Sequence, residues 1–171
     1  VPEGWERLTA PFYVGPDPGE GTELLDMPGN YTSVLLRKEF NITDRDQYQT
    51  YDVRFRTDDG FIGWFNGSEW GRLNIPPGTP TLNLVSGDDS AGNFRDRSFD
   101  FDNFALFLDE GPNVIAIQAI SSELDDDDFF IDFSLAGVLP PENAFLITRS
   151  SPLSSLSFLP PNGFLLLNAS E

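Results

Sequence analysis

The sequence predicts an all-β protein: an antiparallel β-sandwich of the jelly-roll type with an extended, strand-forming C-terminal tail. Short strand-like runs recur along the chain, and 15 Gly and 14 Pro separate them. No long stretch carries apolar residues at helical spacing, so helix is a minor component. The 16 Phe supply large side chains that can fill the space between two sheets.

Each expected strand follows from its local pattern. The strands are expected at 33–40, 51–56, 61–65, 81–85, 98–108, 114–120 and 129–135. Apolar and polar residues alternate in 51–56 and 129–135, as half-buried antiparallel strands require. The run 114–117 has no polar side, which predicts a central strand covered on both faces. Asn66-Gly67 predicts a tight hairpin, because both residues accept the positive φ of a type I′ turn.

Composition excludes several classes of function. The net charge of −18 would repel a phosphate backbone, so no nucleic-acid partner is expected. The chain has no His and no Cys, which removes imidazole bases, thiol nucleophiles and disulfides. Any catalytic site would need paired carboxylates, and no pair stands out in an apolar setting. We therefore expect no enzyme, no required cofactor and, with no apolar run near ~20 residues, no membrane span.

The chain divides by composition at residue 139. Residues 1–138 are expected to form the jelly roll, and 139–171 a Pro-rich apolar tail whose only charged residues are Glu142, Arg149 and Glu171. The tail holds two similar segments, 139–147 and 159–167, each with a Pro-Pro lead into a short apolar run. Such runs must be buried, either in the chain's own sandwich or a neighbouring domain, or on another subunit. The candidate assembly residues are Phe145, Leu146, Ile147, Leu156, Phe158, Leu159, Phe164, Leu165, Leu166 and Leu167.

Two residue types offer candidate binding sites. The acidic run Asp125, Asp126, Asp127 and Asp128 could hold a structural calcium ion, although a solvated acidic turn is the preferred interpretation. The Asp-Asp pairs at 58–59 and 88–89 are weaker candidates of the same kind, because Asp is an ordinary turn former.

Two tryptophans flank the predicted hairpin. Trp64 and Trp70 could stack on a sugar if both rings emerge on one face, and packing in the core is the alternative.

Four Asn-x-Ser/Thr sequons, at Asn66, Asn30, Asn41 and Asn168, are candidate N-glycosylation sites in a source that has the pathway. We expect Asn66 to be modified first, since it lies at the tip of the predicted hairpin.

Several motifs occur in the order seen in galactose-binding-like jelly-roll domains of large secreted bacterial proteins. The stretch 25–40 resembles the opening of such a domain, and 58–61, 66–70, 74–78, 113–118 and 128–132 resemble its successive strands and turns. The resemblance covers residues 11–137 and implies the fold and an extracellular or cell-surface location. It implies no ligand, because such domains serve as spacers, adhesive modules and sugar binders.

Two hypotheses of function follow. The first is a non-catalytic extracellular structural protein, a homopolymer whose subunits are linked head-to-tail through the tail as an inter-subunit strand donor, in a filament or surface layer. The alternative is a carbohydrate-binding or adhesive module of a larger secreted protein, with glycans as its partners.

Overall fold

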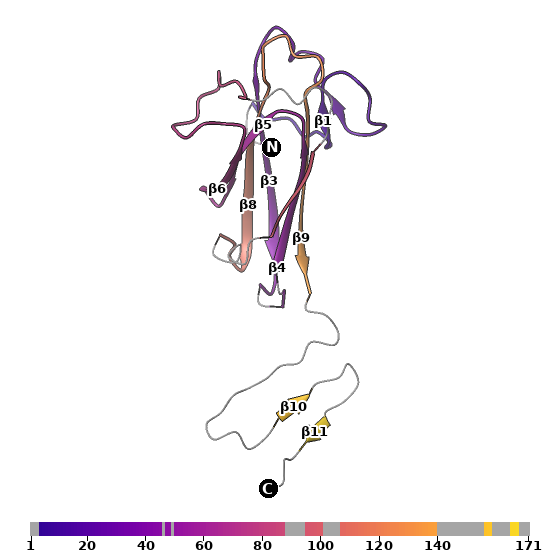
Figure 1. Ribbon diagram of the computed structural model, residues 1–171, viewed down its shortest axis with the longest axis vertical. Helices are drawn as coiled ribbons and strands as arrows, with labels where there is room; N and C mark the ends of the chain where they lie inside the picture. Colours follow the sequence, from indigo (N-terminus) through magenta and orange to yellow (C-terminus); the bar gives the residue numbers. More distant parts are fainter. Residues whose placement is uncertain are drawn as a thin grey trace.

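The computed structural model describes residues 4–45, 47–48, 50–87, 95–100, 107–139, 156–158 and 165–167. These residues form strands, turns and loops, and none of them is helical. Two sheets pack face to face, and the strands run along the long axis of the sandwich (Figure 1). The prediction of an all-β sandwich is confirmed.

The sandwich consists of one five-stranded and one four-stranded sheet. The first has the order β2 (Thr22–Glu23), β1 (Phe12–Tyr13), β9 (Phe130–Val138), β4 (Thr50–Thr57) and β7 (Arg95–Asp100). The second has the order β3 (Ser33–Ile42), β8 (Gly111–Ile120), β5 (Gly60–Phe65) and β6 (Ser68–Leu73). Neighbouring strands pair antiparallel except β1 and β2, which pair parallel.

The connections give the jelly-roll topology. The order β1-β9-β4-β7 in one sheet faces β3-β8-β5-β6 in the other, so the chain crosses repeatedly between the sheets. The predicted hairpin is also present, because Asn66 and Gly67 adopt φ values of 49° and 83° between β5 and β6. β8 lies between β3 and β5, as its continuous apolar run predicted.

Two expected strands were wrong in whole or in part. Residues 81–85 belong to the loop 74–87, because Leu84 packs on the outer face of the four-stranded sheet and the backbone joins no ladder. That loop buries Ile62 and Ile120 from outside, which covers the second face of β8 near its end. Of the expected strand 98–108, the structure places 98–100 in β7 and 107–108 outside any strand, while 101–106 lie outside the described residues.

The tail contains a short hairpin. β10 (Leu156–Phe158) and β11 (Leu165–Leu167) pair antiparallel in a two-stranded sheet of their own. β11 falls within the predicted segment 159–167, whereas β10 lies between the two predicted segments. The assembly residues Phe145, Leu146, Ile147, Leu159 and Phe164 lie outside the described residues. β9 ends at Val138, and the division into two parts at 139 stays a prediction.

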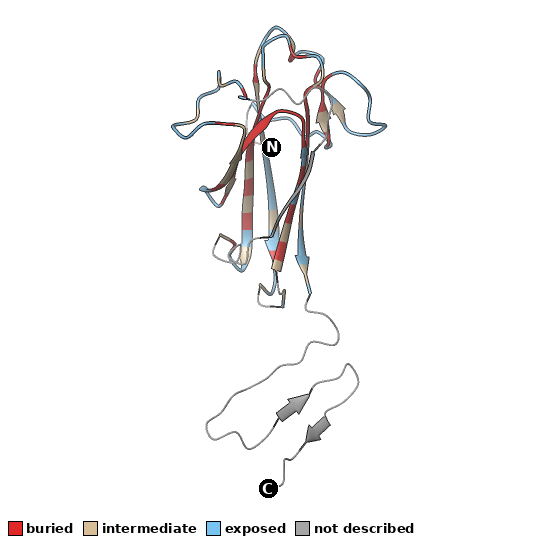
Figure 2. Ribbon diagram, viewed as in Figure 1, coloured by how far each residue is buried: buried red, intermediate tan, exposed pale blue. Residues whose placement is uncertain are grey.

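An aromatic cluster fills the space between the sheets. In β4 the side chains of Tyr51, Val53 and Phe55 face inward by alternation, and Phe55 meets Phe61 of β5 with ring centroids 4.5 Å apart. Figure 2 shows the buried residues along the strands and the exposed ones mainly in the loops. Each fully buried large apolar side chain contributes about 1.5–3 kcal/mol, so this cluster is the main source of stability.

Trp70 of β6 completes that cluster by packing over a glycine. Its indole stacks on Phe55 with ring centroids 5.3 Å apart. Trp70 lies in a β-bulge, since Gly63 pairs with Gly71 while Trp64 pairs with Glu69, which makes Trp70 the extra residue of the bulge. A Cβ added at Gly63 would lie 2.4 Å from Cζ2 of Trp70. Gly63 is therefore required for the close approach of the indole to the backbone of β5.

Gly63→Ala is expected to lower the free energy of unfolding by about 1–3 kcal/mol, because the new methyl group overlaps the indole. Gly71→Ala, in the neighbouring strand, has nothing within 4 Å of its added Cβ and serves as the control, with an expected effect within ~0.5 kcal/mol. Urea denaturation of both variants measures the difference. Equal stability of the two would show that the indole has room for a methyl group.

Candidate functional site

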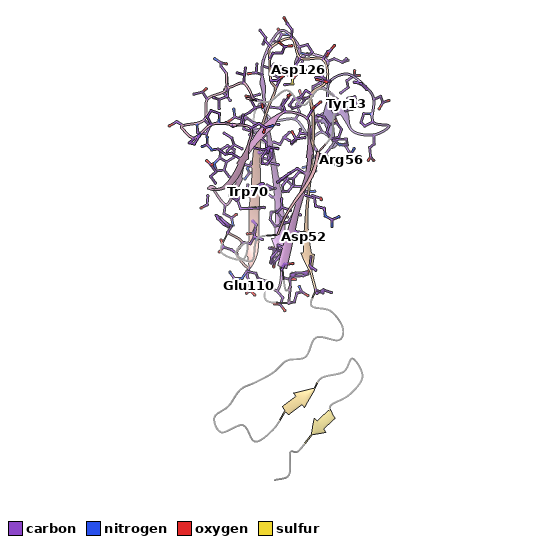
Figure 3. The ribbon with its side chains drawn as sticks, viewed as in Figure 1. Tyr13, Asp52, Arg56, Trp70, Glu110 and Asp126 are labelled. Atoms are coloured by element: carbon purple, nitrogen blue, oxygen red, sulfur yellow. The ribbon has the colours of Figure 1, made fainter. Side chains whose placement is uncertain are left out.

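The two tryptophans that flank the hairpin lie on opposite faces of their sheet. Trp70 is only 9% exposed and packs on Phe61 and Phe65 between the sheets, as labelled in Figure 3. Trp64 points away from the core, because it alternates with the inward Gly63 and packs with the outer cluster around Ile62. The two rings therefore cannot form one stacking platform, and Trp70 is a core residue.

The length of the hairpin loop predicts that the rings of Trp64 and Trp70 lie on opposite faces of the sheet. In a hairpin with a two-residue loop, Phe65 pairs with Ser68 and Trp64 with Glu69, as observed. Trp70 follows Glu69 and must face the other way, since successive side chains in a strand point to opposite faces.

Trp64 occupies the middle of a cross-strand row on the outer face of the four-stranded sheet. Arg37 of β3 pairs with Ala116 of β8, Ala116 pairs with Trp64, and Trp64 pairs with Glu69. Ala116 is small, and the indole of Trp64 is partly exposed. The row thus places an aromatic ring between a positive and a negative side chain.

Both charged ends of this row are held by ion pairs. Arg37 Nη1 lies 2.8 Å from Oε1 of Glu39, and Arg72 Nη2 donates to Oε2 of Glu69 at 2.8 Å. Arg72 also donates to the backbone oxygens of Pro76 and Gly78, which fixes its position. The hydrogen bond from Arg72 lowers the pKa of Glu69, so Glu69 stays ionised at neutral pH.

A second candidate group of residues lies at the end of the sandwich where β4 leads into β5. Asp126 is only 6% exposed, and its carboxylate accepts hydrogen bonds from Ser121 Oγ at 2.7 Å and from the Asp128 N–H at 3.1 Å. Carboxylate oxygens of Asp126, Asp127 and Asp128 lie within 4.8 Å of one another. The structure thus brings together three members of the acidic run, whereas Asp125 is exposed and lies near Gly29.

Asp59 joins this group from the turn between β4 and β5. Its side chain is 1% exposed and forms a hydrogen bond with the carboxyl group of Asp126, and the backbone of Ser122 also bonds to it. Asn74 Nδ2 donates to the Asp59 carbonyl at 2.8 Å and holds the turn. We name Asp59, Asp126, Asp127 and Asp128 the acidic cluster; Figure 3 labels Asp126 at this end and Asp52 and Glu110 at the other.

The two buried carboxyl groups of the acidic cluster differ in their affinity for protons. Burial, the hydrogen bond with Asp126 and the negative charges nearby raise the pKa of Asp59 from 3.8 to about 8. Burial also acts to raise the pKa of Asp126, but hydrogen bonds from Asp59, Ser121 and Asp128 outweigh it and lower the value to about 2. The pair therefore holds one proton at neutral pH. The two carboxyl groups of the pair are in direct contact, whereas the two catalytic carboxyl groups of a glycosidase are separated by ~5–9.5 Å.

The pH dependence of stability follows from Asp59. In buffer with EDTA, the free energy of unfolding should fall as pH rises from about 4 to about 8, by about 1.4 kcal/mol per pH unit, since the folded chain keeps a proton that the unfolded chain releases. Asp59→Asn should flatten this slope, while Asp52→Asn at the opposite end should leave it unchanged. Urea denaturation at a series of pH values measures the slope of the free energy of unfolding against pH. An unchanged slope in Asp59→Asn would show that other groups cause the pH dependence.

The hydrogen bonds of Asn66 bear on the expected order of glycosylation, which stays a prediction. Its Nδ2 donates to the carbonyl of Phe107 at 3.1 Å and to Oδ1 of Asn113 at 2.9 Å, and its Oδ1 accepts from the Val114 N–H. An N-glycan is attached to Nδ2, so the amide would have to leave this network. Asn41 is exposed in β3 and has no comparable set of bonds to the described residues.

The two other sequons differ in their surroundings. Asn30 is exposed, and its Nδ2 donates to the backbone oxygens of Asp26 and Pro28. Asn168 lies outside the described residues.

Expressed in a host with an N-glycosylation pathway, the chain should carry a glycan on Asn41 and none on Asn66, as peptide mapping by mass spectrometry would show. Asn66→Gln should lower the free energy of unfolding by about 1–3 kcal/mol, because its partners, the buried Asn113 among them, lose their bonds. Asn41→Gln is the matched control, with an expected change within ~0.5 kcal/mol. A glycan found on Asn66 of the folded chain would contradict this order.

Comparisons with known proteins give remote likenesses only. No family model matches the chain, and no curated protein matches it. The native alfa-L-rhamnosidase from Aspergillus terreus is similar at 13% identity and a TM-score of 0.40, over 92% of this chain and 15% of that chain. A family 35 carbohydrate binding module from an environmental isolate is similar at 11% identity and a TM-score of 0.34, over 66% of this chain and 75% of that chain. The chain thus spans a small part of the rhamnosidase, and its own side chains must indicate its function.

The described residues contain no helix that is long and apolar enough to span a membrane.

Proposed function

We propose that the chain is a non-catalytic carbohydrate-binding module that binds a polysaccharide on the outer face of the β3-β8-β5-β6 sheet. The observation that carries the proposal is the outward indole of Trp64, set in the row formed by Arg37, Ala116 and Glu69. A flat aromatic ring covers the apolar face of a sugar, and charged side chains beside it bond to the hydroxyl groups. Location outside the cell or at its surface belongs to the same proposal.

The sugar class follows from the charges around Trp64. Glu69 is paired with Arg72, and Glu39 with Arg37, so this face is locally balanced although the whole chain carries −18. Each ion pair offers both donors and acceptors, which suits the hydroxyl groups of a neutral polysaccharide. Because Arg72 is already held by two backbone oxygens, little ordering is required when a ligand binds.

Trp64→Ala is expected to weaken binding to a polysaccharide at least tenfold, since aromatic residues that anchor an interface typically contribute about 2 kcal/mol or more. The measurement is affinity electrophoresis against a panel of soluble neutral polysaccharides, followed by calorimetric titration of the one that retards the chain. The control is Trp5→Ala, which removes an indole that is 40% exposed near the N-terminus.

Two outcomes would contradict the proposal. One is a wild-type chain that no polysaccharide retards, and the other is a Trp64→Ala variant that binds as well as Trp5→Ala. Circular dichroism of both variants separates lost contacts from lost folding, because Trp64 also packs on the cluster of Ile62, Ile75 and Ile120.

The filament hypothesis stays a prediction. It requires the tail to donate a strand to another subunit, whereas the described parts of the tail, β10 and β11, pair with each other. Sedimentation of the purified chain distinguishes the two hypotheses, since a binding module is expected to remain a monomer and a filament subunit to polymerise.

A further inference from the structure

The loop 74–87 covers the outer face of the four-stranded sheet up to the row of residues beside Trp64. That neighbouring outward row consists of Leu35, Gln118, Ile62 and Arg72. Gln118 is only 3% exposed, and its Nε2 donates to the carbonyl of Thr81 in the loop at 2.8 Å. The loop therefore forms a border along one side of the face around Trp64.

Glu69 and Arg72 share the outer face because of the β-bulge at Trp70. Side chains three residues apart in a regular strand point to opposite faces of the sheet. The bulge adds one residue, so that Glu69 pairs with the outward Trp64. Arg72 pairs with Ile62, which also faces outward. The irregular pairing thus places a carboxylate of the Trp64 row next to the guanidinium group of the covered row.

Arg72 joins the Glu69 carboxylate to this loop. Its Nη2 donates to Oε2 of Glu69 and to the carbonyl of Gly78, both at 2.8 Å. Its Nε donates to Oε1 of Glu69, and its Nη1 donates to the carbonyl of Pro76 at 3.0 Å. The side chain of Arg72 is 17% exposed and that of Glu69 is 35% exposed. The carboxylate is therefore the more accessible of the two charged groups.

We propose that Arg72 is a positioning residue of the sugar-binding face, the outer face around Trp64. It holds the Glu69 carboxylate as an acceptor for a sugar hydroxyl group and keeps the loop 74–87 as a rigid border. This inference rests on the proposed function. Arg72 acts through Glu69 and the loop rather than by touching the sugar, because four of its five N–H groups are used within the chain. A carboxylate that is already held loses little side-chain freedom when a ligand binds.

The ionisation of Glu69 distinguishes positioning by Arg72 from simple support of the fold. The hydrogen bond from Arg72 lowers the pKa of Glu69 from 4.5, burial opposes this effect, and the positive charge of Arg72 adds to it. Without Arg72 the effect of burial is unopposed, so the pKa should rise to 4.5 or above. An ionised carboxylate accepts stronger hydrogen bonds than a protonated one. Sugar binding without Arg72 should therefore weaken as the pH falls toward 4.5, whereas the wild-type chain should keep its affinity there.

The first test measures affinity electrophoresis of Arg72→Gln at pH 7 and pH 4.5, in gels that contain soluble xyloglucan, galactomannan or mixed-linkage glucan. At pH 7 binding should be weaker by about three- to tenfold, because Glu69 must then be ordered when the ligand binds. The ratio of the affinities at the two pH values should change as well. Arg72→Lys should restore that ratio but not the full affinity, since an ammonium group keeps the charge and lacks the rigid fork.

The control is Arg54→Gln, which removes an exposed arginine of β4 in the other sheet and should bind like the wild-type chain. Circular dichroism at both pH values verifies that each variant is folded. Equal affinity of Arg72→Gln and Arg54→Gln would overturn the inference. A loss of affinity in Arg72→Gln that is the same at both pH values would overturn it too, because the role of Arg72 would then be support of the fold alone.

Two measurements without a ligand separate this inference from the proposed function. In Arg72→Gln, a carbon-13 NMR titration should show a raised pKa of Glu69. The amide of Gly87, which donates to the carbonyl of Asn74 and closes the loop, should exchange its hydrogen faster. If neither quantity changes, Arg72 does not position Glu69 and the loop. A wild-type chain that binds no polysaccharide would contradict the proposed function, and the two NMR measurements would still decide the role of Arg72.

Discussion

The packing of Trp70 over Gly63 is the contact on which the rest of the structure depends. It brings the indole onto Phe55, Phe61 and Phe65, so that one side chain from β6 closes the aromatic core between the sheets. The same contact sits at the bulge that sets the pairing of β5 with β6. Because Trp70 is inside, its neighbour Glu69 and the paired Trp64 are outside, and the sugar-binding face that we propose follows from the register.

The fold could be predicted because its signals are local. Alternation in 51–56, the apolar run of β8 and the turn at Asn66-Gly67 each depend on neighbouring residues, and all three were found where expected. The prediction of a strand at 81–85 was wrong for the opposite reason. Their apolar side chains match a strand by composition, but Leu84 is buried by contact with Ile62 and Ile120, and such a contact between distant segments leaves no period in the sequence.

The candidate sites show the same division. The opposite directions of Trp64 and Trp70 follow from a two-residue loop and simple alternation, so the sequence is sufficient to predict them. The contact between Asp59 and Asp126 was not accessible, because it depends on how two loops meet at one end of the sandwich. A run of acidic residues is conspicuous in a sequence, yet which of its members turns inward depends on the hydrogen bonds of Ser121 and Asp128.

The acidic cluster and the outward indole of Trp64 are connected through β5. Asp59 immediately precedes this strand, and Trp64 stands near its other end, with Ile62 between them in the cluster formed with Ile75 and Ile120. A buried group of carboxylates destabilises the turn unless a proton or a cation compensates it. A loosened turn would release the start of β5 and with it the packing beneath the indole. A ligand that needs Trp64 in a fixed position is therefore expected to bind more weakly when the acidic cluster is uncompensated, even though no acidic residue of the cluster touches it.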